Sequence, residues 1–268
     1  MTLQSVANST AMLVDNNVEP FKVSPANTLH EQFPLYFCAT LADTEQQKQR
    51  IYRLRHQVYC EELQFEPERM DGEEQDDFDC RSLHVAINKC SSDALAGTVR
   101  IVTSQFNNEQ LPLEHYCSNT LTNTVLAPNN FSRQHICEIS RLAVPADIRS
   151  RALLSQQVDA EVNCNKLVAI SLYLVAQILC LRAGRIHAYV MVEPALARAL
   201  RRVGIHFVQI GQPVNLNGLR APHYLDVRTM TATLKPDYLK LRTMLEAQLF
   251  SKTKHARPSI ALCYSAKD

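Results

Sequence analysis

The sequence predicts a mixed α/β fold, of the α+β type, with one sheet flanked by helices in a single domain. Two strand-like runs, 83–88 and 95–103, are separated only by a polar turn and therefore indicate an antiparallel hairpin. Later strands alternate with helices, and no internal repeat or Gly/Ser linker divides the 268 residues. We expect one core over residues 32–250, between a flexible N-terminal arm (1–31) and a loose basic tail (251–268).

Local signals support the elements of the first half. Residues 35–41 have the composition of a strand, and Asp43 or Thr44 follows as a helix N-cap. From residue 45 to residue 63, apolar side chains recur every three to five positions, which predicts an amphipathic helix. Beyond the hairpin, the polar connection 104–134 is long enough that we expect it to be either functional or mobile.

The second half alternates more regularly. A strand at 136–144 is closed by Pro145, and an apolar helix at 167–181 ends near Gly184. Pro194 opens a further helix at a favoured first position. The remaining expected elements are strands at 186–192, 206–210 and 223–227, the end of the Pro194 helix at Gly204, and a last helix at 236–250.

The formal net charge of +1 conceals an asymmetry along the chain. Residues 1–140 hold 10 Lys and Arg against 19 Asp and Glu, whereas residues 141–268 hold 18 against 8. A general nucleic-acid coat is excluded, because half of the molecule would repel phosphate. The basic half suits a different anionic partner.

Cysteine usage and hydropathy indicate the compartment. The nine cysteines have no C-x-x-C spacing, which excludes a zinc ribbon or disulfide framework and favours a reducing cytoplasm. No export signal is visible at the start of the chain. The apolar run 167–181 is shorter than the about 20 residues that a membrane span needs. We therefore expect a cytoplasmic protein with no membrane span, and a buried core helix at this position.

The densest charged motif is the segment 71–79, which has six carboxylates in nine positions. A calcium loop would need glycine at its sixth position and glutamate at its twelfth, where this sequence has Asp76 and Ser82. No metal site is therefore expected. The alternative is a solvated acidic loop, but a buried Phe78 would pin Asp76 and Asp79 in place.

Charged residues also interrupt the apolar strands. Glu138 and Arg141 lie in one predicted strand and Arg100 in another, and buried charges are costly unless they are paired or line a cavity. With the strand period of two, Glu138 and Ser140 share a face that Arg141 does not. Both charges reach one pocket only if the strand contains a bulge. For Arg55, on the first long helix, a solvated face is the simpler interpretation.

Four blocks then form a recognisable order: Arg55-x-x-Val58-Tyr59, Glu74-x-Asp76-x-Phe78-Asp79, Gly97-x-x-Arg100 and Glu138-x-Ser140-Arg141. Together they resemble the signature of the acyl-homoserine-lactone (autoinducer) synthases. They also look like the related N-acyl amino acid synthases and exosortase-associated acyltransferases, all within the GCN5-related N-acyltransferase (GNAT) superfamily. The blocks cover residues 53–144. The resemblance implies a GNAT-like mixed sheet with a splayed central strand, which the later elements fit by architecture only.

The sequence departs from the family pattern in three places. The tryptophan that lactone synthases carry shortly after the first Arg block is absent, and Phe65 sits near its place. The segment 145–151 lacks the glycines of the pyrophosphate loop of ordinary acetyltransferases. The polar stretch before the apolar helix is more similar to the exosortase-associated and N-acyl amino acid synthase groups, which are therefore the closest resemblance.

The resemblance implies an N-acyltransferase that moves a fatty acyl group from a thioester to the amine of an amino acid or similar small acceptor. Glu138 is the candidate general base. Arg141 and Arg100 complete the catalytic candidates, because they would orient Glu138 and the acidic loop or bind an acceptor carboxylate. The candidates for acceptor binding are Arg55, Asp76, Phe78, Asp79 and Ser140.

The donor is expected to be an acyl carrier protein (ACP) or CoA thioester, a co-substrate and not a tightly bound cofactor. Its pantetheine arm would follow the splayed strand, with a phosphate beyond the strand end. The donor-binding candidates are Leu142, Val144, Arg149 and Arg151. The helix at 167–181 either walls an acyl tunnel or packs in the core. Arg198, Arg201 and Arg202 share a helix face and either dock an acidic carrier protein or form a solvated face.

Two other functions fit the sequence. One is an acyl-homoserine-lactone synthase that consumes S-adenosylmethionine, which the missing tryptophan disfavours. The other is a non-catalytic module that binds an acyl group or carrier protein and would not need Glu138.

Overall fold

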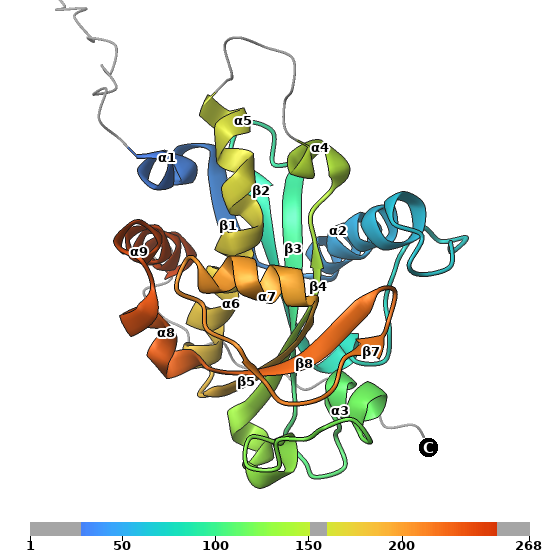
Figure 1. Ribbon diagram of the computed structural model, residues 1–268. Helices are drawn as coiled ribbons and strands as arrows, with labels where there is room; N and C mark the ends of the chain where they lie inside the picture. The colour runs from blue at the N-terminus through green and yellow to red at the C-terminus, as the bar shows by residue number, and fades with distance from the viewer. Residues whose placement is uncertain (1–27, 151–159, 251–268) are drawn as a thin grey trace, which may run out of the picture.

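An eight-stranded mixed sheet forms the centre of the structure, a computed structural model that describes residues 28–150 and 160–250 (Figure 1). The sheet confirms the predicted fold class. Its strands are β1 Phe37–Leu41, β2 Ser82–Lys89, β3 Leu95–Thr103, β4 Ile136–Ala143, β5 His187–Val192, β6 Val208–Gln209, β7 Val214–Asn215 and β8 Leu219–Asp226. The order across the sheet is β1-β2-β3-β4-β5-β8-β6, and β7 pairs with β8. All of these pairs are antiparallel except β4 with β5, which is parallel.

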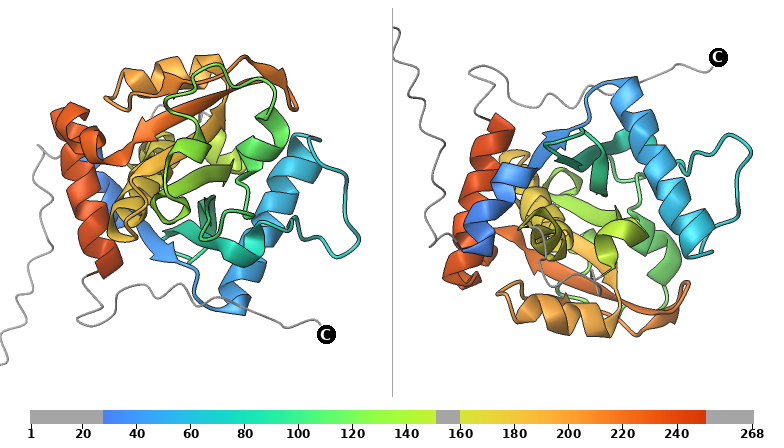
Figure 2. Two further views of the ribbon diagram at one scale, coloured as in Figure 1. Left: turned by 90° about the horizontal axis from the view of Figure 1, so that it is seen from below. Right: turned by 90° about the horizontal axis from the view of Figure 1, so that it is seen from above.

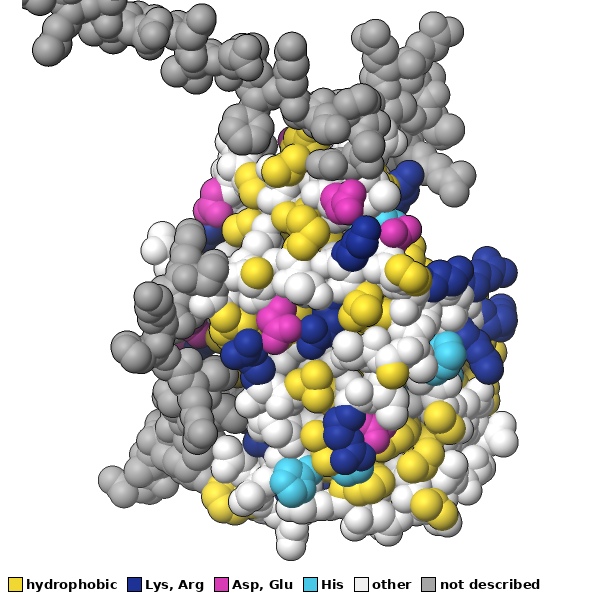
Figure 3. Space-filling model, turned by 90° about the vertical axis from the view of Figure 1, so that its left-hand side faces the viewer, with side chains coloured by type: hydrophobic (Ala, Val, Ile, Leu, Met, Phe, Trp, Pro, Cys, Tyr) yellow, Lys and Arg dark blue, Asp and Glu magenta, His cyan; other side chains and the backbone are white. Residues whose placement is uncertain are grey.

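Helices cover both faces of the sheet. They are α1 Leu29–Tyr36, α2 Glu45–His56, α3 Pro112–Cys117, α4 Ala146–Arg149, α5 Ala160–Cys164, α6 Val168–Arg182, α7 Pro194–Arg201, α8 Val227–Thr233 and α9 Pro236–Phe250. Helices α1, α6 and α9 lie on one side of the sheet and α2 lies on the other (Figure 2). On the face formed by α1, α8 and α9, charged side chains of both signs are interspersed with apolar ones (Figure 3).

The N-terminal boundary differs from the prediction. Helix α1 begins at Leu29, after a capping box formed by Thr28 and Glu31, and it buries Phe33 completely. Residues 29–31, which were predicted to belong to the arm, are therefore helical, and the strand expected from residue 35 begins only at Phe37. The rest of the predicted arm (1–27) and the predicted tail (251–268) lie outside the described residues.

Helix α6 is central to the largest apolar core. Residues 160–182, which join α5 and α6, form the one helical stretch in the described ranges that is long and apolar enough to cross a membrane. The prediction of a run too short to span was therefore wrong on length, but 72% of the apolar window is buried inside the fold. Leu172, Val175 and Leu179 are fully or almost fully buried in the core. Packing against the sheet accounts for the apolar character of this helix, as predicted.

Gly97 allows β3 to lie close to α6 and β4. A Cβ at this position would come within 3.1 Å of the Ala143 carbonyl oxygen and of the side chains of Val168 and Leu172. The glycine of the Gly97-x-x-Arg100 block thus permits the close packing of strand and helix behind Arg100.

The last part of the sheet differs most from the prediction. The strand expected at 206–210 contains only two paired residues, whereas β8 begins at Leu219, four residues before its expected start. The hairpin that joins β7 to β8 turns at Asn217 and Gly218, which both have positive φ. Helix α8 was not predicted, because its threonine-rich sequence has low helix propensity, and it is stabilised by burial of Val227 and Met230.

Candidate active site

A bulge in β4 shapes the candidate site. Thr98 pairs with Ala143 and Arg100 pairs with Ser140, so Val99 alone opposes the two residues between Ser140 and Ala143. Arg141, the first of those two, has a φ of 48°. The bulge required for Glu138 and Arg141 to reach one pocket is therefore present. Beyond Ile139, β4 no longer pairs with β5, which splays the central strands as the resemblance implied.

The helix before the acidic loop is also irregular. After His56, the chain continues as a π-helical turn, Gln57–Glu62, in which the Leu63 amide donates to the Val58 carbonyl. Tyr59 in this turn donates its hydroxyl to the Leu142 carbonyl at 2.8 Å. This bond ties the helix to the bulged part of β4.

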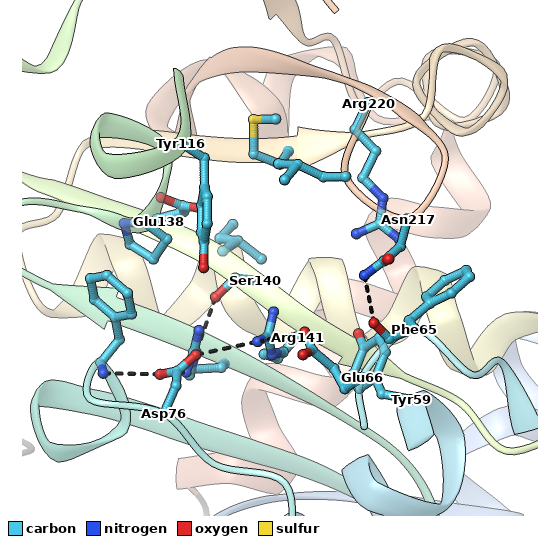
Figure 4. A pocket seen from close by; sticks show the side chains of 16 residues that line it. Tyr59, Phe65, Glu66, Asp76, Tyr116, Glu138, Ser140, Arg141, Asn217 and Arg220 are labelled. Carbon is cyan, nitrogen blue, oxygen red and sulfur yellow. Dashed lines mark hydrogen bonds and ion pairs between the residues drawn. The ribbon is translucent and has the colours of Figure 1, made fainter. Parts of the chain in front are cut away.

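The two irregular elements border a cavity of about 270 Å³ (Figure 4). The predicted site residues that line it are Asp76, Phe78, Arg100, Glu138, Ser140 and Arg141. Arg55 and Asp79 are buried and do not line it, and Leu142, Val144 and Arg149 line a different cleft. Arg151 lies outside the described residues.

A buried ion-pair network closes one side of the cavity. Arg55, whose side chain is fully buried, donates to Glu74 at 2.5 Å and to Asp79 at 2.7 Å. Arg100 donates to Asp76 at 2.6 Å and to Asp79 at 2.9 Å. The simpler interpretations of a solvated helix face for Arg55 and a solvated acidic loop were therefore wrong, because these carboxylates hold buried guanidinium groups.

The network keeps Asp79 ionised. Burial opposes ionisation of Asp79, but the hydrogen bonds and charge of Arg55, with the charge of Arg100, outweigh it and hold the pKa of Asp79 well below its usual range. Burial lowers the pKa of neighbouring His84 to about 4, so this imidazole is neutral at pH 7. Phe78 is half-buried, and its amide donates to Asp76 at 2.9 Å, which helps to order the loop.

Arg141 is held by three carboxylates. It lies 3.1 Å from Glu74, 3.2 Å from Glu66 and 3.4 Å from Asp76. Neither Arg141 nor Arg100 makes a hydrogen bond to Glu138 among those found in the described residues. Protein carboxylates already occupy both guanidinium groups, so these arginines affect Glu138 through their charge and not through a hydrogen bond.

Glu138 has a different kind of partner. Its side chain accepts a hydrogen bond from the Leu113 backbone amide at 2.7 Å, and only 2% of the residue is exposed. Burial raises the pKa of Glu138 to about 7, although the Leu113 bond and the charge of Arg100 favour the carboxylate. Glu138 is thus a buried acid that gains and loses its proton near neutral pH.

The connection 104–134 supplies this partner. Arg133 donates to Glu114 at 2.8 and 2.9 Å and to Ser104 at 2.8 Å, which fixes α3 against the sheet. Leu113 lies in this short helix, so its amide is held in place for Glu138. Of the two alternatives for the long connection, the ordered and functional one fits the structure.

Comparison with protein-family models gives a match for the first part of the described chain. Residues 54–158 match the family model described as acetyltransferase (GNAT) domain. This matched stretch, which contains the four motif blocks, is similar to a GNAT domain. A comparison with curated protein sequences gives no significant match.

Several solved structures are similar to this chain in fold. TofI, solved in a ternary complex with an inhibitor and MTA, superposes with a TM-score of 0.56 at 16% identity, over 79% of this chain and 99% of TofI. BjaI, a CoA-dependent acyl-homoserine lactone synthase solved with SAM and isopentyl-CoA, gives 0.56 at 18%, over 79% of this chain and 90% of BjaI. The AHL synthase LasI gives 0.51 at 14%, over 72% and 90%. At these identities the likeness concerns the fold.

A second cleft, of about 300 Å³, lies beside the splayed end of β4. Leu142, Val144 and Arg149 line it, as do Lys166 and Ala169 at the start of the α6 region. Arg149 forms an ion pair with Glu62. Lys166, which the sequence analysis did not identify, is exposed at the same cleft.

The sequence analysis also missed residues of the first cavity. Tyr116 comes from the long connection, and Asn217 and Arg220 come from the β7–β8 hairpin. No local pattern marks these residues, because each reaches the cavity only through the packing of a segment distant in sequence. Phe65, noted only for the missing tryptophan, also lines the cavity.

Proposed function

We propose that this GNAT domain transfers a fatty acyl group from an ACP or CoA thioester to the amine of an amino acid or similar small acceptor. The observation that supports it most is Glu138, a buried carboxyl group in the cavity whose pKa is raised to about 7. A base with a pKa near neutrality can accept a proton from a substrate ammonium at physiological pH.

The proposed step begins with the acceptor in the first cavity. Glu138, directly or through one water, takes a proton from the ammonium, and the free amine attacks the thioester carbonyl carbon. The new C–N bond forms as the C–S bond breaks, and the thiolate leaves with the carrier and takes up the second proton that the nitrogen loses. General-base assistance contributes about 10²–10⁴ in rate, and holding amine and thioester together supplies much of the remainder.

The cleft beside β4 is the proposed donor side. Leu142 and Val144 offer an apolar wall for a pantetheine arm, and Arg149 with Lys166 offers positive charge for its phosphate. Arg151, outside the described residues, remains a further candidate. The β4–β5 splay lies between this cleft and Glu138, so a thioester lying there would present its carbonyl to the acceptor cavity.

The remaining residues have positioning roles in this proposal. Arg55 and Asp79 act through the acidic loop, since neither lines the cavity. Arg100 and Arg141 hold Asp76 at the cavity wall, and Ser140 accepts a hydrogen bond from Arg100 at 3.1 Å. We further propose that the acyltransferase domain extends from α1 to α9 and acts in a reducing cytoplasm, consistent with the free cysteines of the described ranges.

Two substitutions test the assignment. Glu138→Gln is isosteric and removes only the base, so we expect kcat/KM for acyl transfer to fall about 10²–10⁴-fold. Arg100→Ala should also reduce transfer, and Arg100→Lys should recover part of it because it retains the charge. Folding is checked by circular dichroism. Full acyl transfer by folded Glu138→Gln and Arg100→Ala variants would show that the site is wrongly assigned.

The same assay separates the alternatives by product. Mass spectrometry distinguishes an N-acyl amino acid from an acyl lactone formed with S-adenosylmethionine. Tight acyl-carrier binding without product, unchanged by Glu138→Gln, would support the non-catalytic module. Analysis of lipids that co-purify with the expressed protein identifies the acyl chain independently of any assay.

A further inference from the structure

The three arginines that line the acceptor cavity differ in whether a protein carboxylate pairs with them. Arg100 and Arg141 line it, and each is paired with protein carboxylates at 2.6 to 3.4 Å. Arg220 also lines it, yet within residues 28–150 and 160–250 it has no carboxylate partner. It is thus the one cavity arginine of the described chain whose charge is uncompensated.

Arg220 lies on the same face of the sheet as Glu138. Glu138 pairs with Tyr189 and Tyr189 pairs with Tyr224 across β4, β5 and β8. Arg220 is four residues before Tyr224 on β8, and an even spacing along a strand keeps side chains on one face. Figure 4 accordingly shows Glu138 and Arg220 on opposite sides of the same cavity.

The β7–β8 hairpin is anchored above the cavity. Asn217 at its turn donates to the Phe65 carbonyl oxygen at 2.8 Å (Figure 4). The Arg220 guanidinium lies 5.5 Å from the centroid of the Phe65 ring. Neither contact uses the N–H donors of the Arg220 guanidinium. The face of the Phe65 ring attracts the positive charge but does not accept a pair of N–H hydrogen bonds.

We infer that Arg220 is a binding site for the carboxylate of the acceptor, so that the substrate is an amino acid and not a simple amine. The inference rests on the proposed function and names its substrate class. Glu138 and Arg220 are the two charged groups of the cavity that lack an ionic partner among the described residues. An amino acid zwitterion has one charge for each, with its ammonium toward Glu138 and its carboxylate toward Arg220. Arg100 and Arg141 cannot serve the carboxylate equally, because it would have to displace Asp76, Glu66 or Glu74.

The charge balance favours a carboxylate over a phosphate. Glu66, Asp76 and Glu138 also line the cavity, and they would repel a dianion more than a monoanion. A planar carboxylate also matches the fork of a guanidinium in a bidentate pair. The cavity interior is partly apolar, with Ile139, Met191 and Leu216, so it suits an acceptor with an apolar side chain.

The test compares acceptors that differ only in the carboxylate. The twenty common L-amino acids and their carboxamides are assayed with octanoyl-CoA, and the best-accepted amino acid is carried forward with its carboxamide. Arg220→Gln should raise KM for the amino acid at least about tenfold, which corresponds to the loss of one charge-assisted hydrogen bond. The same substitution should change KM for the carboxamide less than about twofold. Arg220→Lys should lie between the two, because it retains the charge without the fork.

Lys235→Gln is the matched control. Lys235 is exposed in the turn between α8 and α9 and does not line the cavity, so its loss changes the net charge equally. This variant should have the wild-type preference for the amino acid over its carboxamide. Circular dichroism confirms that each variant is folded.

Calorimetric titration of the same ligands tests the carboxylate site separately from the proposed acyl transfer. Preferential binding of the amino acid, lost in Arg220→Gln, supports the carboxylate site even if no acyl transfer occurs, in which case the proposed function fails alone. Acyl transfer without discrimination between amino acid and carboxamide, or discrimination that survives Arg220→Gln, overturns the inference alone. Absence of both transfer and binding overturns both.

Discussion

The charged groups on the two sides of the acceptor cavity have different kinds of partners. On the side of the acidic loop, Arg55 and Arg100 share Glu74, Asp76 and Asp79 in a buried network with contacts of 2.5 to 2.9 Å. On the other side, Glu138 of β4 has only a backbone amide as a polar partner, and Arg220 of β8 has only an aromatic ring, among the contacts of the described residues.

The difference separates charges that maintain the site from charges that are available to a substrate. A buried charge whose lone pairs or protons are all satisfied has little to offer a ligand, whereas removing one member leaves its partners unpaired. A buried charge without a counter-ion raises the energy of the free protein and can be compensated when substrate binds. We therefore expect the largest losses of stability from mutations on the first side, and losses of activity without a loss of stability from mutations on the second.

The largest stability effect should come from Arg55. Arg55→Met leaves Glu74 and Asp79 buried without their main cation, and we expect a loss of about 3–5 kcal/mol in the free energy of unfolding. Arg53→Met is the matched control on the same helix, because the Arg53 side chain is 64% exposed and, within the described part of the chain, pairs only with Glu73. Its loss should cost no more than about 1 kcal/mol. Urea unfolding measures both, and equal effects would refute a structural role specific to the buried network.

Replacing Glu138 should increase the free energy of unfolding, whereas replacing Arg55 should decrease it. The folded protein retains a proton on Glu138 up to about pH 7, whereas the usual pKa is 4.5. Between these values the native state binds more protons than the unfolded state, so this group's contribution to stability falls as the pH rises and is lost above pH 7. Glu138→Gln removes this penalty.

We therefore expect Glu138→Gln to be more stable than the wild type at pH 8, by up to about 3 kcal/mol, and equally stable at pH 4. Activity of the wild type should rise with pH through about 7, as the base loses its proton. Thermal unfolding and kcat/KM at several pH values measure the two effects. Glu45→Gln, on the exposed start of α2, is the control and should change neither. A destabilised Glu138→Gln at pH 8 would contradict the assignment of Glu138 as an unpaired buried acid.

Charge reversal at the exposed arginines of α7 and its C-cap should have the smallest effect on the free energy of unfolding. Arg198, Arg201 and Arg202 are exposed. Reversing them to glutamate should change the free energy of unfolding by less than about 0.5 kcal/mol. If ACP is the donor, the reversal should weaken ACP binding and reduce its salt dependence. Unchanged binding in titrations at low and high salt would mean that these arginines form only a solvated face.

Much of the fold and part of the site were predictable from local patterns. The hairpin β2–β3, the strand β4 and the helices α6 and α9 follow from hydrophobic periodicity and turn residues. The charged residues within apolar strands identified Arg100 and Glu138, since buried charges need a reason. The condition of a bulge at Arg141 followed from the strand period alone, and the structure fulfils it.

The partners of these residues were not predictable in the same way. Arg141 was expected beside Glu138, but the left-handed backbone at the bulge turns it toward Glu66 and Glu74. The partner of Glu138 is a backbone amide, which any residue at position 113 except proline would supply. A backbone donor leaves no trace in a sequence pattern.

The sequence by itself determined the fold class, the four motif blocks and the presence of charge inside the strands, because periodicity and burial cost are local properties of the chain. Only the tertiary structure decided which charges are satisfied. Arg220 follows the motif blocks by about 80 positions in the sequence and reaches the cavity because β8 pairs with β5, which in turn pairs with β4. Whether a charge is paired depends on such contacts between distant strands, and therefore on the fold as a whole.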